Sequence, residues 1–171
     1  MEAQGNEAVV DSAIVRLREQ HAELRRERTL DLRVPGWSGM LVARYTPVRA
    51  GEMRKLASRV DRLESQATPE ADLAAAADLI ITTCKEILVV VDGEKRTLQD
   101  EAGKDAPVRF DKQLAEILGF EAESAREVVY GCFPQFPDGS PIETTINAHA
   151  LEVAEWITNV DEEVSSDLGE G

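Results

Sequence analysis

Hydrophobic residues recur at alternating steps of three and four at the start of the chain, which is the spacing of one helix face. This stripe predicts a helix over residues 6–28 whose other faces are charged. It covers about two heptads, too few for a stable isolated coiled coil. We therefore expect it to dock on its own domain or on a partner. Its members are Val10, Ile14, Leu17, His21 and Leu24.

The step changes to two after residue 29, which is the period of a strand with one buried face. Residues 30–34 and 41–46 predict the two strands of a hairpin, joined by a short connection with two glycines. Trp37 and Met40 lie at the tip of this hairpin. Such large apolar side chains either fold back beneath a loop, which is their usual fate, or form an exposed tip for a partner.

Two helices are predicted in the middle of the chain. The first covers residues 50–66. The second begins at Thr68-Pro69-Glu70, which combines a capping hydroxyl, a proline at the first helical position and an acid near the positive end of the dipole. Its apolar stripe is wide and predicts a central buried helix that continues to Leu88, through Leu73, Ala76, Ala77, Ile80, Ile81, Cys84 and Ile87.

Residues 89–98 predict a second short hairpin with an Asp92-Gly93 turn, followed by a polar loop over residues 99–106. Capping signals then predict three helices, which begin after Asp111, Ser124 and Ser140. In the first we expect Leu114, Ile117 and Leu118 to be buried. The apolar stripe of the last helix consists of Ile146, Ala150, Val153, Ile157 and Val160.

The predicted fold class is mainly α with a small β component (α+β), and 171 residues suffice for about one domain. We divide the chain into an N-terminal amphipathic helix over residues 1–28, a single globular helical domain over 29–160 and an acidic tail over 161–171. The last 29 residues hold eight acids and no Lys or Arg.

The formal net charge of −14 disfavours nucleic acids and anionic membrane surfaces as partners. A basic or apolar partner is easier to accommodate, although solubility alone also explains the charge. Residues 1–6 lack an apolar signal core, and the longest apolar run, residues 87–91, is too short to span a bilayer. We expect a cytoplasmic protein in which Cys84 and Cys132 are core residues.

The sequence predicts no catalytic residue, no cofactor and no metal site. It lacks a phosphate loop, and Ser38 does not have the spacing of a nucleophile elbow. His149, Glu152 and Glu155 share a helix face, but a metal site needs ligands from other elements. We expect His21 to be a partly buried, hydrogen-bonded residue rather than a catalyst. The candidate partner-binding residues are Val10, Ile14, Leu17, Leu24, Trp37 and Met40.

The order of the segments carries a family resemblance. The chain runs through LDLRVPGWSGMLVARYTPV, EMRKLASRV, ADLAAAADLIITTCKEILV, PVRFDKQLAEILGF, SAREVVYGCFP and AHALEVAEWITNVDEEV. Over about residues 29–164 this succession resembles the tail assembly chaperones of long-tailed bacteriophages that infect actinobacteria.

The resemblance implies a protein without enzymatic activity that binds the tape measure protein, a long and largely helical chain. It implies that the apolar stripes of that chain stay covered until tail-tube subunits polymerise around it. The chaperone would act in the cytoplasm of the infected host and be absent from the mature virion. The tail-tube protein and a second copy of this chain are further candidate partners.

Three other readings stay open from the sequence. The nearest is a virion structural protein, such as a tail or head–tail joining component, which would form a defined ring. A small enzyme would need convergent polar residues in a pocket. A regulatory binding module of the bacterial host is the third.

Overall fold

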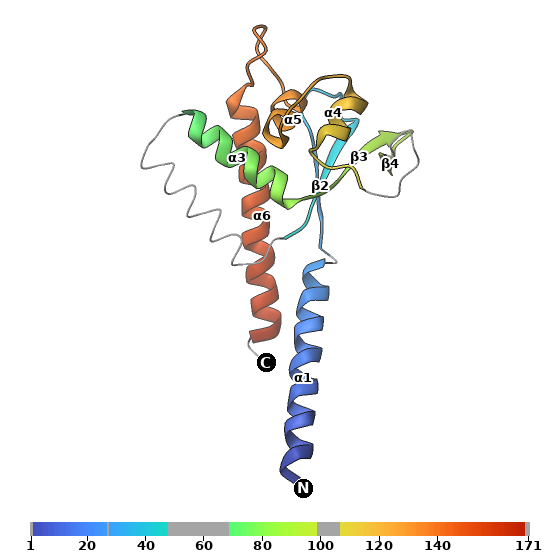
Figure 1. The fold of residues 1–171 in the computed structure, drawn as a ribbon, viewed down its shortest axis with the longest axis vertical. Coiled ribbons are helices and arrows are strands. Elements are labelled where there is room, and N and C mark those ends of the chain that lie inside the picture. The colour runs from blue at the N-terminus through green and yellow to red at the C-terminus, as the bar shows by residue number, and fades with distance from the viewer. Residues whose placement is uncertain (1, 27, 48–68, 99–106, 170–171) are drawn as a thin grey trace.

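The computed structural model describes residues 2–26, 28–47, 69–98 and 107–169 (Figure 1). Five helices lie in these ranges: α1 (Glu2–Arg26), α3 (Pro69–Thr83), α4 (Lys112–Leu118), α5 (Ala125–Cys132) and α6 (Glu143–Gly169). The predicted helix over residues 50–66 and the predicted loop over 99–106 lie outside the described residues. The predicted α+β class is confirmed.

Four strands form one antiparallel sheet in the order β1 (Leu30–Arg33), β2 (Leu41–Tyr45), β3 (Cys84–Val91) and β4 (Glu94–Thr97). Both predicted hairpins are present, and β2 and β3 join them. Ala43 of β2 lies opposite Leu32 of β1 on one side and Ile87 of β3 on the other. The pairing of β2 with β3 joins residues far apart in sequence, so no local sequence pattern predicts it.

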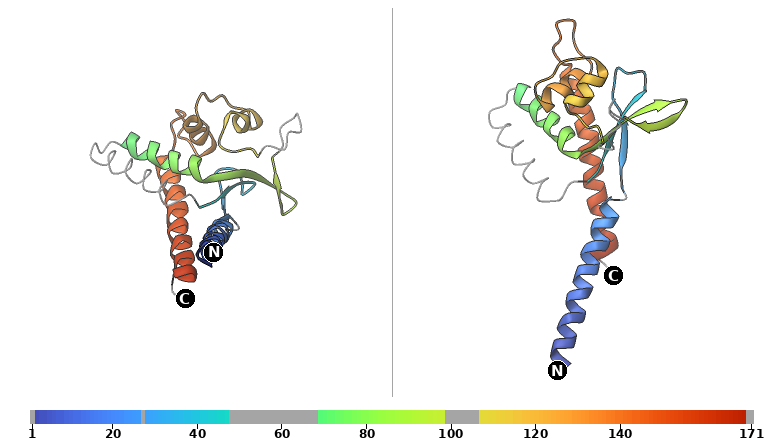
Figure 2. Two further views of the ribbon diagram at one scale, coloured as in Figure 1. Left: turned by 60° about the horizontal axis from the view of Figure 1, so that its bottom comes forward. Right: turned by 45° about the vertical axis from the view of Figure 1, so that its right-hand side comes forward.

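The apolar core lies between this sheet and helices α3, α5 and α6, which lie on one side of it (Figure 2). From β2 the core takes Leu41, Ala43 and Tyr45. The predicted stripe of α6 is confirmed, since all five of its members are buried: Ile146, Ala150, Val153, Ile157 and Val160. We call the sheet together with helices α3 to α6 the body.

The prediction of a helix that continues to Leu88 is wrong, because α3 ends at Thr83 and β3 begins at Cys84. The Thr83 hydroxyl donates to the Leu79 carbonyl at 2.7 Å at the end of the helix. Beyond it the β-branched run at residues 89–91 favours an extended chain, and residues 84–89 pair with β2. Cys84 and Ile87 are buried as predicted, but as strand residues.

The caps of the two short helices are confirmed. Asp111 accepts a hydrogen bond from the Leu114 amide at 3.1 Å, and Gly119 ends α4 with a φ of 86°. Ser124 accepts from the Glu127 amide at 3.2 Å and starts α5. Leu114 is buried as predicted and Leu118 is partly buried. The prediction that Ile117 is buried is wrong: Leu114 and Ala115 form the buried side of α4, and Ile117 lies off that side and is exposed.

The last helix begins at Glu143, two residues after the predicted first helical residue, Pro141. The Ser140 amide and hydroxyl both donate to Asp138, at 2.9 and 2.6 Å. The Ile142 amide donates to the Pro134 carbonyl at 2.9 Å, which holds the chain extended until α6 begins at Glu143. At its other end α6 continues to Gly169. The acidic segment that we separated at residue 161 is therefore helical from residue 161 to residue 169.

Candidate binding surface

Helix α1 projects from the body, with its N-terminal part far from every other element (Figures 1 and 2). Its C-terminal part lies antiparallel beside the end of α6, where Arg28 forms an ion pair with Glu163. The contact with the body is therefore confined to one end of the helix.

The predicted stripe on α1 is exposed. The side chains of Val10, Ile14 and Leu17 are 56%, 40% and 57% exposed. The side chain of Leu24 lies outside the described part of the chain. We expected this stripe to dock on its own domain or on a partner. Over residues 8–23 its own domain does not cover it.

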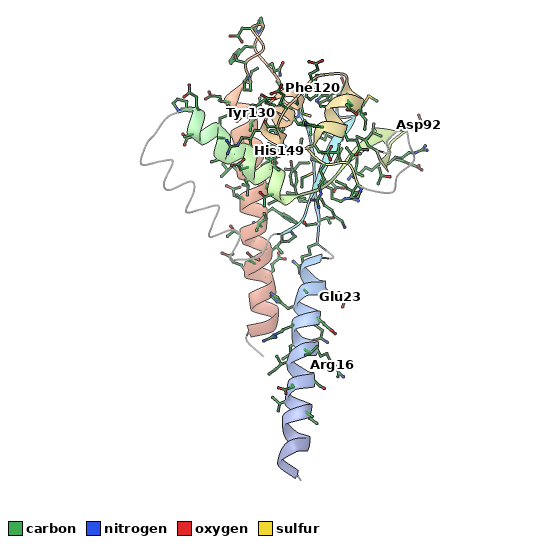
Figure 3. All side chains as sticks on the ribbon, in the orientation of Figure 1. Arg16, Glu23, Asp92, Phe120, Tyr130 and His149 are labelled. Atoms are coloured by element: carbon green, nitrogen blue, oxygen red, sulfur yellow. The ribbon has the colours of Figure 1, made fainter. Side chains whose placement is uncertain are left out.

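Two further observations describe the surroundings of this stripe. His21 is exposed, so the expectation that it is partly buried is wrong. Arg16 and Glu23 extend from α1 into solvent (Figure 3). The helix thus carries both apolar and charged side chains that are exposed to water.

The tip of the β1–β2 hairpin separates its two large apolar residues. The indole Nε1 of Trp37 donates to the Cys132 carbonyl at 2.6 Å, and Trp37 packs against the core. Met40 is 52% exposed. Trp37 therefore follows the expectation of a side chain that folds back, whereas Met40 remains available to a partner.

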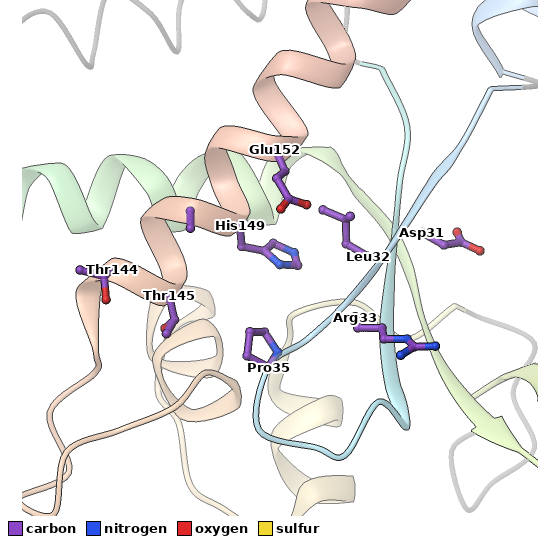
Figure 4. Close-up of a pocket in the computed structure, with 9 residues that line it drawn as sticks. Asp31, Leu32, Arg33, Pro35, Thr144, Thr145, His149 and Glu152 are labelled. Carbon is purple, nitrogen blue, oxygen red and sulfur yellow. The ribbon is translucent and has the colours of Figure 1, made fainter.

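An open pocket of about 640 Å³ lies between β1 and α6 (Figure 4). His149 extends from α6 toward β1 in this space, with Leu32 and Pro35 on the opposite side. The other residues that line it are Asp31, Arg33, Thr144, Thr145, Ala148 and Glu152.

His149 and Tyr45 form a buried hydrogen-bonded pair beside this pocket. The His149 Nε2 lies 2.6 Å from the Tyr45 hydroxyl, and Phe133 packs edge-on against the His149 ring. Burial lowers the pKa of His149 to about 4 and raises the pKa of Tyr45 well above its ordinary value. Both groups are uncharged at neutral pH, and a neutral imidazole with its hydrogen on Nδ1 accepts the Tyr45 hydrogen.

The sequence did not reveal this pair or its pocket. Tyr45 and His149 are separated by 104 positions, and only the packing of α6 on the sheet brings them together. His149 lies beside Ala150 of the apolar stripe, which was the one available signal of its burial. The sequence pattern placed His149 on a helix face with Glu152 and Glu155. In the structure its ring contacts Tyr45 and Phe133 instead.

Charged side chains on the other face of the sheet pair across the strands. Arg44 of β2 donates to Asp31 of β1 at 2.8 Å and to Glu86 of β3 at 3.0 Å, and Lys95 of β4 also donates to Asp31 at 2.8 Å. Chiefly the hydrogen bond from Arg44 holds the pKa of Asp31 below its ordinary value. These cross-strand pairs stabilise the sheet order.

The two cysteines are buried free thiols, as predicted. Burial raises the pKa of both Cys84 and Cys132 to about 12, so both stay protonated at neutral pH and are poor nucleophiles.

Within the described ranges, no three His, Cys, Asp or Glu side chains are placed together to hold a metal ion. No helix there is both long and apolar enough to cross a membrane.

Comparison of this chain with protein-family models, with curated proteins and with solved structures finds no match. Phe136 and Leu151 are also exposed apolar side chains, but they are not part of a predicted stripe. We take the exposed apolar stripe of α1, with Met40 as a second apolar site, as the candidate binding surface.

Proposed function

We propose that this protein is a phage tail assembly chaperone that binds helical apolar segments of the tape measure protein. It keeps that long chain soluble until tail-tube subunits polymerise around it. The proposal assigns it a binding role rather than catalysis. It places the protein in the cytoplasm of the infected host and outside the mature virion.

The observation that carries the proposal is the exposed stripe of α1. Val10, Ile14 and Leu17 form one helix face that no part of the described body covers. An amphipathic helix presented in this way recognises another helix through apolar residues spaced three and four apart. The tape measure protein of the resembled family is long and helical, which matches that mode of recognition.

The charge of the chain supports the same role. A chaperone bound to an apolar client must keep the complex soluble, and a net charge of −14 opposes association between loaded complexes. Binding that favours the unaggregated client also shifts its equilibrium away from aggregation by mass action.

Co-expression with the candidate tape measure protein, followed by size-exclusion chromatography of the soluble fraction, tests the proposal. We expect the long protein to be insoluble alone and to elute with this chain when both are present. If it stays insoluble while this chain assembles into a discrete ring, the proposal fails in favour of the virion structural reading.

Two matched variants test whether co-elution depends on the exposed stripe of α1. Leu17→Asp should abolish co-elution, because it places a charge in the centre of the apolar face. Leu151→Asp on α6 is the control, since Leu151 is 58% exposed and Leu17 is 57% exposed. Equal loss of binding in both variants would contradict the assignment to α1.

A further inference from the structure

The exposed face of α1 has the arrangement of a short coiled-coil seam. In a heptad lettered a to g, Val10 and Leu17 occupy d positions, and Ile14 and His21 occupy a positions. Between residues 8 and 23 only Ala22 is partly buried. Ala22 lies about a third of a turn from the seam on a helix of 3.6 residues per turn. The seam thus lies on a different side of α1 from this partly buried position.

The two flanks of this seam differ in charge. The e positions hold Asp11 and Arg18, and the g positions hold Ala13 and Gln20. All four side chains are exposed. One flank therefore carries an acid and a base one heptad apart, while the other flank is uncharged.

This difference selects one orientation for a pair of identical helices. In a parallel pair, e positions face g positions, so Asp11 and Arg18 would meet only uncharged side chains. In an antiparallel pair, e positions face e positions. With Ile14 packed against Leu17 of the second copy, Asp11 faces Arg18 of the second copy, and the two-fold axis repeats that ion pair.

We infer that α1 is a self-association helix whose seam pairs antiparallel with the seam of a second copy of this chain. The projection of α1 beyond the body leaves room for this arrangement, with the two bodies at opposite ends of the paired helices (Figure 1). The seam covers about two heptads, so we expect a weak dimer that forms only at high protein concentration. This inference does not depend on the proposed function: the second copy covers the stripe in the absence of any client.

Sedimentation equilibrium of the full chain over a wide range of protein concentrations tests the inference. We expect a monomer–dimer equilibrium. Asp11→Arg places like charges opposite each other, as does Arg18→Asp, and each should raise the dimer dissociation constant roughly tenfold at low salt. Circular dichroism should be unchanged, because both residues are exposed.

The decisive sample is an equimolar mixture of the two charge variants. In an antiparallel heterodimer, the arginine introduced at position 11 of one variant faces the aspartate introduced at position 18 of the other. At the other end of the seam, the unchanged Arg18 of the first variant faces the unchanged Asp11 of the second. Both contacts are attractive, so the mixture should regain the affinity of the unchanged chain.

Three results would overturn the inference. The first is a chain that stays monomeric at every concentration. The second is a pair of charge variants that each dimerise as tightly as the unchanged chain. The third is a mixture of the two variants that fails to recover the affinity of the unchanged chain.

The variants Leu17→Asp and Leu151→Asp also test whether the α1 seam, rather than another exposed apolar surface, forms the dimer. Leu17→Asp should abolish the dimer, and Leu151→Asp should leave its dissociation constant unchanged. Loss of the dimer in Leu151→Asp with retention in Leu17→Asp would assign self-association to α6 and overturn the inference.

Discussion

Helices α1 and α6 both carry a mainly aliphatic stripe at the same three–four spacing, yet the two stripes have opposite surroundings. The stripe of α6 is at most 5% exposed at every position, from Ile146 to Val160. On α1, the stripe residues Val10, Ile14 and Leu17 are at least 40% exposed. Periodicity thus identifies which face of a helix is apolar, whereas the tertiary structure decides whether that face is covered.

The difference follows from what each helix contacts. Helix α6 packs on α3 and on the sheet, so its stripe completes the core. Helix α1 contacts the body at one end only. The apolar face of α6 therefore contributes to folding, and that of α1 remains available for association with another helix.

The largest expected effect tests this contrast with one substitution at two sites. Ile157→Ala should lower the free energy of unfolding by about 3 kcal/mol, because it leaves a cavity in the core. Ile14→Ala should change it by less than about 0.5 kcal/mol. Urea denaturation at low protein concentration, where α1 is unpaired, measures both. Equal losses would mean that the α1 stripe is covered within the monomer.

Two histidines extend the comparison to pH. His149 is buried on α6, and its pKa of about 4 lies below the ordinary value of 6.5. The unfolded chain therefore binds more protons between these two values, so stability is lost as the pH falls from 6.5 toward 4. From about pH 7.5 to about pH 5, His149 should lower the free energy of unfolding by about 2 kcal/mol.

Chemical denaturation across this pH range measures the effect in matched variants. His149→Met should flatten the loss of stability, at some cost in stability at neutral pH from the unpaired Tyr45 hydroxyl. His21→Met, at an exposed site on α1, should retain the pH dependence of the unchanged chain. An unaltered profile in His149→Met would show that the imidazole is not buried uncharged.

The hairpin tip repeats the contrast over four residues, with a smaller effect. Trp37→Phe removes the donor to the Cys132 carbonyl and should lower the free energy of unfolding by about 1 kcal/mol. Met40→Ala should have almost no effect, since Met40 is exposed. Thermal unfolding compares the two variants. A larger loss in Met40→Ala would reverse the assignment of the two side chains.

Local signals predicted much of the fold. The step of two residues located β1 and β2, and the caps at Asp111 and Ser124 located α4 and α5, because each depends on residues close together in sequence. The α6 stripe was predicted member by member for the same reason. The boundary between α3 and β3 was missed because Ile80, Cys84 and Ile87 fit a helix face, although the last two are buried in a strand.

The candidate surface was predicted less completely than the fold. The α1 stripe was recognised as a face in need of a partner, but its exposure depends on where the body lies. The hydrogen bond of Trp37 to Cys132 spans 95 positions, and that of Tyr45 to His149 spans 104. Pairing at such separations is set by the sheet, and no local pattern specifies it.

The smallest expected effect lies within α6 itself. Leu151 lies between the buried stripe positions Ala150 and Val153, but it faces solvent. Leu151→Gln should change the free energy of unfolding by less than about 0.5 kcal/mol, since Leu151 is already 58% exposed. Urea denaturation beside Ile157→Ala measures the contrast on one helix. A loss near that of Ile157→Ala would mean that position on the helix face does not determine the contribution to stability. The difference between α1 and α6 would then need another cause than the burial of their stripes.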